Sequence, residues 1–221
     1  MRVWLPDRPG ALGQVASRIG AVRGEIVGID ILERGGGRAI DELAVDLPDA
    51  DLRDLLVQEI SQVDGVSVEE IRSVGDALHD PRLDALEAAA VLVGATERDA
   101  LLDAVVTHSH RVIGASWTAI VSLDDCEVQA GQGDIPAPGW LVAFVAGSQT
   151  SARVAAGESG PDDVVWAPLP AAGLALVVGR DTSAFRARER RQVAALARIV
   201  DTRLGELLRM SVRRSHPSTP R

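Results

Sequence analysis

Hydrophobic and polar positions in the first third of the chain switch between the period of a strand and that of a helix. Residues 3–5 are apolar, and apolar residues then recur at helical spacing from Leu12 to Val22. This pattern predicts a strand, then a helix over 11–23, with Gly24 as the C-cap of that helix.

A hairpin, a second helix and a final strand are predicted to follow. Segments 25–33 and 39–47 alternate apolar and polar residues on either side of a glycine-rich turn at 35–37. A helical pattern over 52–60 precedes Gly65, and residues 66–71 have the composition of a strand. The predicted order is therefore βαββαβ, that of a ferredoxin-like split unit in the α+β class.

The second part of the chain begins after a stretch without pattern, 75–82, which we interpret as a linker. Helices are expected over 83–93, from the N-cap Thr96 to 112, and over 187–210. Strands are expected at 117–123, 126–130, 164–170 and 174–180, with the prolines of 164–170 placing that strand at an edge or ending it there. The apolar run 140–145 fits either a strand or part of a helix.

These patterns divide the chain into a first domain over 1–74, the linker, a second domain over 83–210 and a polar tail over 211–221. The net charge of −9 argues against broad binding to nucleic acid or to an anionic membrane. Neither a signal peptide nor an apolar run long enough to span a bilayer is recognised, so a soluble cytoplasmic protein is expected.

The loop after the first strand has the composition of a ligand site. Asp7-Arg8-Pro9-Gly10-Ala11-Leu12 forms a tight turn into a helix, where the amides of Gly10, Ala11 and Leu12 suit a carboxylate. Asp7 is suited to accept a bond from an ammonium group, or to cap the helix itself. An amino-acid site and a capped turn with nothing bound explain this segment equally well.

No other group of residues supports catalysis, a metal or a cofactor. His108 and His110 are two residues apart on a predicted helix and point about 200° apart, so they do not chelate one metal. Cys126 is the single cysteine, and an inert small hydrophobic residue is a better interpretation than a nucleophile. We expect no enzymatic activity, and any enzyme that the protein regulates is a separate chain.

The βαββαβ order, together with Asp7, Pro9, Gly10, Ala11 and Leu12 in the first loop, resembles an ACT domain over residues 1 to about 74. The resemblance implies a regulatory module that binds an amino acid and pairs side by side as a homodimer. It also implies a second contact from the partner subunit at Gly28-Ile29-Asp30, where many members carry Asn in place of Asp30. The implied site is thus the first loop with Ile29 and Asp30.

The second part is similar to a reduced GAF domain with an antiparallel sheet between helices. The resemblance rests on the segments 103–106, 117–121, 166–169, 173–180 and 194–197 and on Phe185. It implies a regulatory protein that senses an amino acid in its first domain and transmits the signal to its second. The alternative is an interaction protein whose first domain dimerises and binds no ligand.

Overall fold

The computed structural model describes residues 1–73, 81–149 and 161–215 of the chain. It divides into two compact units, Met1–Leu78 and His79–Arg221, and each is described by itself. Both units combine helices with a four-stranded antiparallel sheet, so the predicted α+β class is confirmed. The linker expected at 75–82 falls almost entirely outside the described residues.

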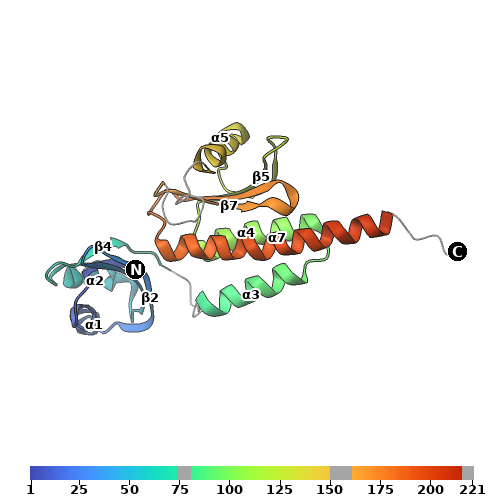
Figure 1. Ribbon diagram of the computed structural model, residues 1–221. Coiled ribbons are helices and arrows are strands. Elements are labelled where there is room, and N and C mark those ends of the chain that lie inside the picture. The colour runs from blue at the N-terminus through green and yellow to red at the C-terminus, as the bar shows by residue number, and fades with distance from the viewer. Residues whose placement is uncertain (74–80, 150–160, 216–221) are drawn as a thin grey trace. The chain divides into compact units, whose positions relative to one another are not determined.

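The first unit has the βαββαβ order that its hydrophobic pattern predicts (Figure 1). Its elements are β1 (Arg2–Pro6), α1 (Ala11–Ala21), β2 (Glu25–Gly35), β3 (Arg38–Asp46), the single turn η1 (Ala50–Leu52), α2 (Arg53–Ser61) and β4 (Ser67–Glu70). The strands lie in the order β2-β3-β1-β4 and pair antiparallel throughout. The two edges of this sheet are therefore β2 and β4.

Alternation along the central strands builds the core of the first unit. Val3 and Leu5 on β1, with Leu43 on β3, are buried against the apolar faces of both helices. The helices contribute Val15, Ile19, Leu56 and Ile60. Because side chains of a strand alternate between faces, every second residue of β1 and β3 lies on this helix-covered face.

Helix α1 ends two residues earlier than predicted. Its C-cap is Val22, and Arg23 adopts a left-handed φ of 60°. The amide of Gly24 donates to the carbonyl of Ile19 over 3.0 Å. A Cβ atom at Gly24 would lie 2.9 Å from the Ile19 side chain, so close packing and not a positive φ explains this glycine.

The second unit has its sheet in the order β6-β5-β8-β7. Its elements are α3 (Pro81–Gly94), α4 (Arg98–Ile113), β5 (Trp117–Ser122), β6 (Val128–Gln132), α5 (Pro138–Gln149), β7 (Val164–Leu169), η2 (Pro170–Ala172), β8 (Leu174–Gly179) and α7 (Ala187–Ser215). Strand β7 lies at an edge, as its prolines predict.

Several features of this unit differ from the sequence-based expectation, including strand β6, which starts at Val128 and not at 126. The ambiguous run 140–145 belongs to helix α5. The N-cap of α4 is Glu97 and not Thr96. Helix α7 continues to Ser215 instead of ending at 210, and the rest of the expected tail, 216–221, lies outside the described residues.

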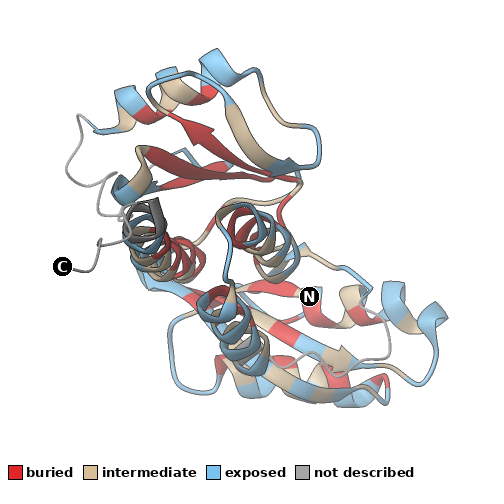
Figure 2. Cartoon of the chain, turned by 90° about the vertical axis from the view of Figure 1, so that its right-hand side faces the viewer, coloured by how far each residue is buried: buried red, intermediate tan, exposed pale blue. Residues whose placement is uncertain are grey.

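Helices cover both faces of this sheet (Figures 1 and 2). Ile120 and Leu176 face a core formed with α3, α4 and α7. On the other face, Trp117 and Val177 pack against Leu141 and other side chains of α5. Among the described residues no helix is long and apolar enough to cross a membrane.

Candidate functional site

The loop between β1 and α1, residues 7–10, is exposed and held by its backbone. The Asp7 amide donates to the Gly37 carbonyl over 2.9 Å, which fixes the loop beside the turn of the β2–β3 hairpin. Gly10 is the N-cap of α1 with a φ of 87°, a conformation that glycine adopts without strain. The loop therefore leaves the N-terminus of α1 at the surface.

Two of the three amides assigned to a carboxylate are available at this N-terminus. The Ala11 amide donates to the Arg8 carbonyl over 3.3 Å, so it is engaged within the turn. Within the described parts of the chain, the amides of Gly10 and Leu12 donate no hydrogen bond. Asp7 does not cap the helix, since α1 has no side-chain cap. The partial positive charge at this end is thus unmatched by the protein.

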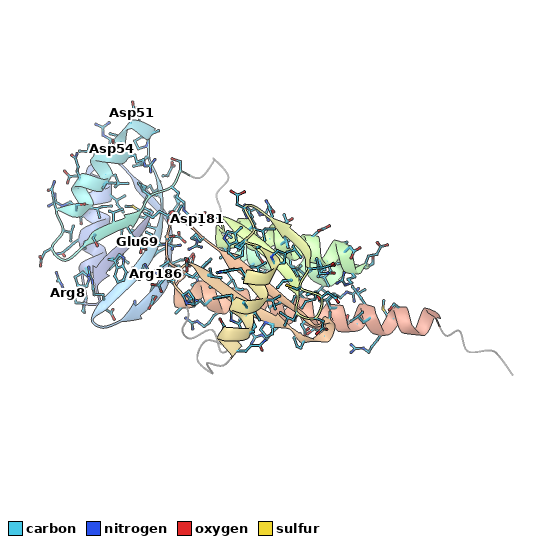
Figure 3. All side chains as sticks on the ribbon, turned by 90° about the horizontal axis from the view of Figure 1, so that it is seen from above. Arg8, Asp51, Asp54, Glu69, Asp181 and Arg186 are labelled. Carbon is cyan, nitrogen blue, oxygen red and sulfur yellow. The ribbon has the colours of Figure 1, made fainter. Side chains whose placement is uncertain are left out.

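The other helix of this unit, α2, also has no side-chain cap, but acidic residues surround its start. The Asp49 carboxylate caps the preceding turn η1 by accepting from the Asp51 amide over 3.0 Å, and Asp54 lies in the first turn of α2. Asp51 and Asp54 lie together at the start of α2, away from Arg8 of the opening loop (Figure 3). The first turn of α2 therefore carries a negative charge, whereas that of α1 has no acidic residue.

Charged side chains of the sheet join the opening loop. The Nε atom of Arg34, on β2, lies 4.0 Å from Oδ1 of Asp7. Asp41, on β3, is only 3% exposed, and its Oδ1 has no hydrogen-bond partner among the described residues. Burial raises the pKa of Asp41, while the Arg34 guanidinium lowers it and the negative charge of Asp7 raises it further.

Neither Asp41 nor Arg34 was recognised from the sequence, although Asp41 had a readable signal. It stands between Ala39 and Leu43, which are both buried in the core beneath the helices. Alternation therefore assigns this carboxylate to the core-facing side of β3. A charged residue at such a position is uncommon without a partner.

The two predicted site residues on β2 lie on opposite faces of the sheet. Ile29 is opposite Leu43, on the helix-covered face, and its side chain is 44% exposed at the sheet edge. Asp30 is opposite Glu42, on the other face. One chain therefore brings Asp7, Pro9, Gly10, Ala11 and Leu12 together in one loop and does not bring Asp30 to their side of the sheet.

Other candidate groups do not form a comparable arrangement. His108 and His110 lie on α4, and Cys126 is exposed at a turn with a φ of 56°. Over the described ranges, no three His, Cys, Asp or Glu side chains are grouped to hold a metal ion. An open groove of about 420 Å³ lies between α3 and α7, but its Arg203 already donates to the Ala95 carbonyl and pairs with Glu206.

The fold and the loop geometry define an α+β protein of two units with an uncapped helix N-terminus in the first. Comparison with the known protein families gives no match for this chain. Comparison with curated proteins gives no significant relative. A functional conclusion therefore rests on the residues themselves.

Proposed function

We propose that the chain is a non-enzymatic regulatory protein that binds an amino acid at the opening loop of its first unit. In this proposal the first unit is a ferredoxin-like ACT domain, and the second is a reduced GAF-like domain that transmits the binding event. The ligand α-carboxylate accepts from the amides of Gly10 and Leu12. Its α-ammonium group lies against the carboxylate of Asp7.

The observation that carries the proposal is the unsatisfied N-terminus of α1 next to an exposed carboxylate. Gly10 leaves space for a close approach, because nothing lies within 4 Å of the position that a Cβ atom would occupy. The side chain of Asp7 is 43% exposed and so is accessible to a ligand. Amides for an anion beside an acid for an ammonium group are the two halves of a zwitterion site.

Regulation in this proposal works by linkage to assembly. Strand β2 is an 11-residue edge whose side chains Val27, Ile29 and Ile31 are more than two-fifths exposed. A second copy of the chain that pairs along β2 would bring its own Ile29 close to the site. A ligand that binds the paired form more tightly then favours pairing by that difference in affinity.

Titration calorimetry with the twenty amino acids tests the proposal. We expect binding by the full chain, and a loss of about tenfold to a hundredfold in Asp7→Ala, because a hydrogen bond to a charged group contributes roughly 1.5–3 kcal/mol. Gly10→Val should weaken binding further, since a β-branched residue is strained at this φ and its side chain occupies the approach to the amides. Gly20→Ala, at the far exposed end of α1, is the matched control and should bind like the wild type.

The same exposed edge favours the second candidate, an interaction protein that pairs through β2 and binds no ligand. An edge strand with apolar side chains is sufficient for pairing by itself. If the chain forms a dimer and none of the twenty amino acids binds, this second function replaces the first. If amino acids bind equally well to Gly10→Val, the site lies outside the opening loop.

A further inference from the structure

The buried carboxylate of Asp41 is unexplained by the fold. It lies on the helix-covered face of β3, opposite Val3 of β1 and Ile31 of β2. Those neighbours are apolar, and no hydrogen-bond partner of its Oδ1 lies within the described ranges. A buried carboxylate in such a position destabilises a protein unless a cation or donor joins it.

The charged groups around Asp41 carry a net negative charge, which one more cation would neutralise. The electrostatic neighbours of Asp41 are Arg34 of β2 and Asp7 of the opening loop. Two carboxylates and one guanidinium give this cluster a net charge of −1. Arg34 is 58% exposed and lies 4.0 Å from Asp7, while no ion pair within 4.0 Å joins it to Asp41. Arg34 therefore pairs with Asp7 and acts on Asp41 only at longer range.

We infer that Asp41 is a specificity-determining residue of the opening-loop site and selects amino acids with a cationic side chain. The inference rests on the proposed function, which already assigns the ligand α-carboxylate to the amides and its α-ammonium group to Asp7. Asp41 is more deeply buried than Asp7 and lies on a different element. The side chain of a bound lysine, ornithine or arginine extends from the loop toward β3, and its charged end lies against Asp41.

Lysine and norleucine form a matched pair for the test, because they differ only in the terminal ammonium group. We expect calorimetry at pH 7 to show that wild-type protein binds lysine about tenfold to a hundredfold more tightly than norleucine. Asp41→Asn keeps the shape of the side chain and removes its charge. In this variant the affinity for lysine should fall to that for norleucine, and the affinity for norleucine should not fall.

Two further variants strengthen the test. Asp46→Asn removes an exposed carboxylate from the same strand and should keep the preference for lysine. Arg34→Gln removes a repulsive charge near the ligand cation, so the preference for lysine over norleucine should increase. Each variant is compared with the wild type for folding by circular dichroism before titration.

The outcomes separate this inference from the function on which it rests. Equal affinities of the wild type for lysine and norleucine, or an unchanged ratio in Asp41→Asn, overturn the role of Asp41. If amino-acid binding is then still lost in Gly10→Val, the proposed function stands without it. Absence of binding by every amino acid overturns both.

Discussion

At the scale of single residues, Asp41 is expected to cost the free protein stability. Its carboxylate is buried without a hydrogen bond to Oδ1, and a buried unsatisfied polar group costs about 1–3 kcal/mol. Asp41→Asn should therefore stabilise the first unit, and each 1 kcal/mol raises the melting temperature of a domain of this size by about 4–8 °C. Scanning calorimetry measures this. An unchanged or lower melting temperature would show that Asp41 is well accommodated.

The stabilisation by Asp41→Asn should depend on pH in a defined direction. Because the pKa of Asp41 is raised above 3.8 by folding, the native state binds more protons than the unfolded state between 3.8 and the raised value. Stability of the wild type relative to Asp41→Asn therefore falls as pH rises through this interval. Urea unfolding of both proteins from pH 4 to 7 should show a growing difference.

Gly179 lies where close packing against a neighbouring side chain excludes any residue larger than glycine. It pairs with Trp117 across β5 and β8, and a Cβ atom at this position would overlap the indole ring. Gly179→Ala should destabilise the second unit by about 1–3 kcal/mol, the usual effect of overpacking a core. Tryptophan fluorescence during urea unfolding measures the change. Gly147→Ala, on α5 with open space around it, should be neutral or stabilising.

Sequence patterns predicted the residues of the opening loop but not the residues beside it. Gly10 and Asp7 are adjacent in the sequence to the strand and helix that position them, so local rules suffice. Arg34 and Asp41 reach the same place only through strand pairing. Which residues of two strands lie opposite one another depends on register, and two bulges shift the register between β2 and β3.

At the scale of elements, one buried ion pair joins the end of α4 to the start of α7. Arg180 follows β8 and donates to the carbonyls of Ile113 and Gly114 at the end of α4. Its guanidinium also bonds Glu189 over 2.7 Å, and the other oxygen of Glu189 accepts from the Arg186 amide before α7. A single arginine thus satisfies the carbonyl end of one helix and contacts the first turn of another.

Glu189→Ala should be strongly destabilising, because it leaves the buried guanidinium of Arg180 without its counter-charge. Removing one partner of a buried pair typically costs about 3–5 kcal/mol. The partly exposed pair of Arg203 and Glu206, also 2.7 Å apart, is the control, and Glu206→Ala should cost less, about 1 kcal/mol. Urea unfolding of the two variants compares them. Equal losses would contradict the structural role of the Arg180 junction.

The spacing of apolar residues distinguished helices from strands wherever one face of the element is exposed to water. Helix α5 is the exception: residues 140–145 are all apolar, so no polar face reveals a period. Leu141 and Val145 face the sheet, while Trp140 is 46% exposed and stacks on Phe144 with 5.3 Å between ring centroids. The early end of α1 escaped prediction for a different reason, since Arg23 takes a left-handed conformation that favours glycine.

At the scale of the whole molecule, element order was predictable, whereas only one feature of strand order was, namely the edge position of β7. Alternating patterns identify strands, but the strands that pair with each other depend on packing between residues far apart in the sequence. The structure identifies β2 as an edge of the first sheet, and this makes its exposed apolar side chains significant. It also leaves Leu86 of α3 70% exposed in the second unit. Each surface is a separate candidate for contact with another copy of the chain.

We expect the chain to be a dimer at micromolar concentration, paired through β2. A long edge strand with Val27, Ile29 and Ile31 exposed leaves backbone groups and apolar surface uncovered in a monomer. Light scattering should report twice the mass of one chain. Ile29→Lys places a charge in the paired edge and should give a monomer with an unchanged circular dichroism spectrum. This result would show that the dimer forms through β2, the strand beside the proposed ligand site.

Leu86→Lys provides the matched control, because it places the same charge on an apolar surface of the other unit. A dimer that survives this change and dissociates in Ile29→Lys pairs through β2. If only Leu86→Lys gives a monomer, the second unit carries the interface, and ligand binding at the opening loop is not linked to pairing through β2. A wild-type monomer would contradict both interfaces. It would also restrict any regulation to changes within one chain, since no partner subunit would then adjoin the site.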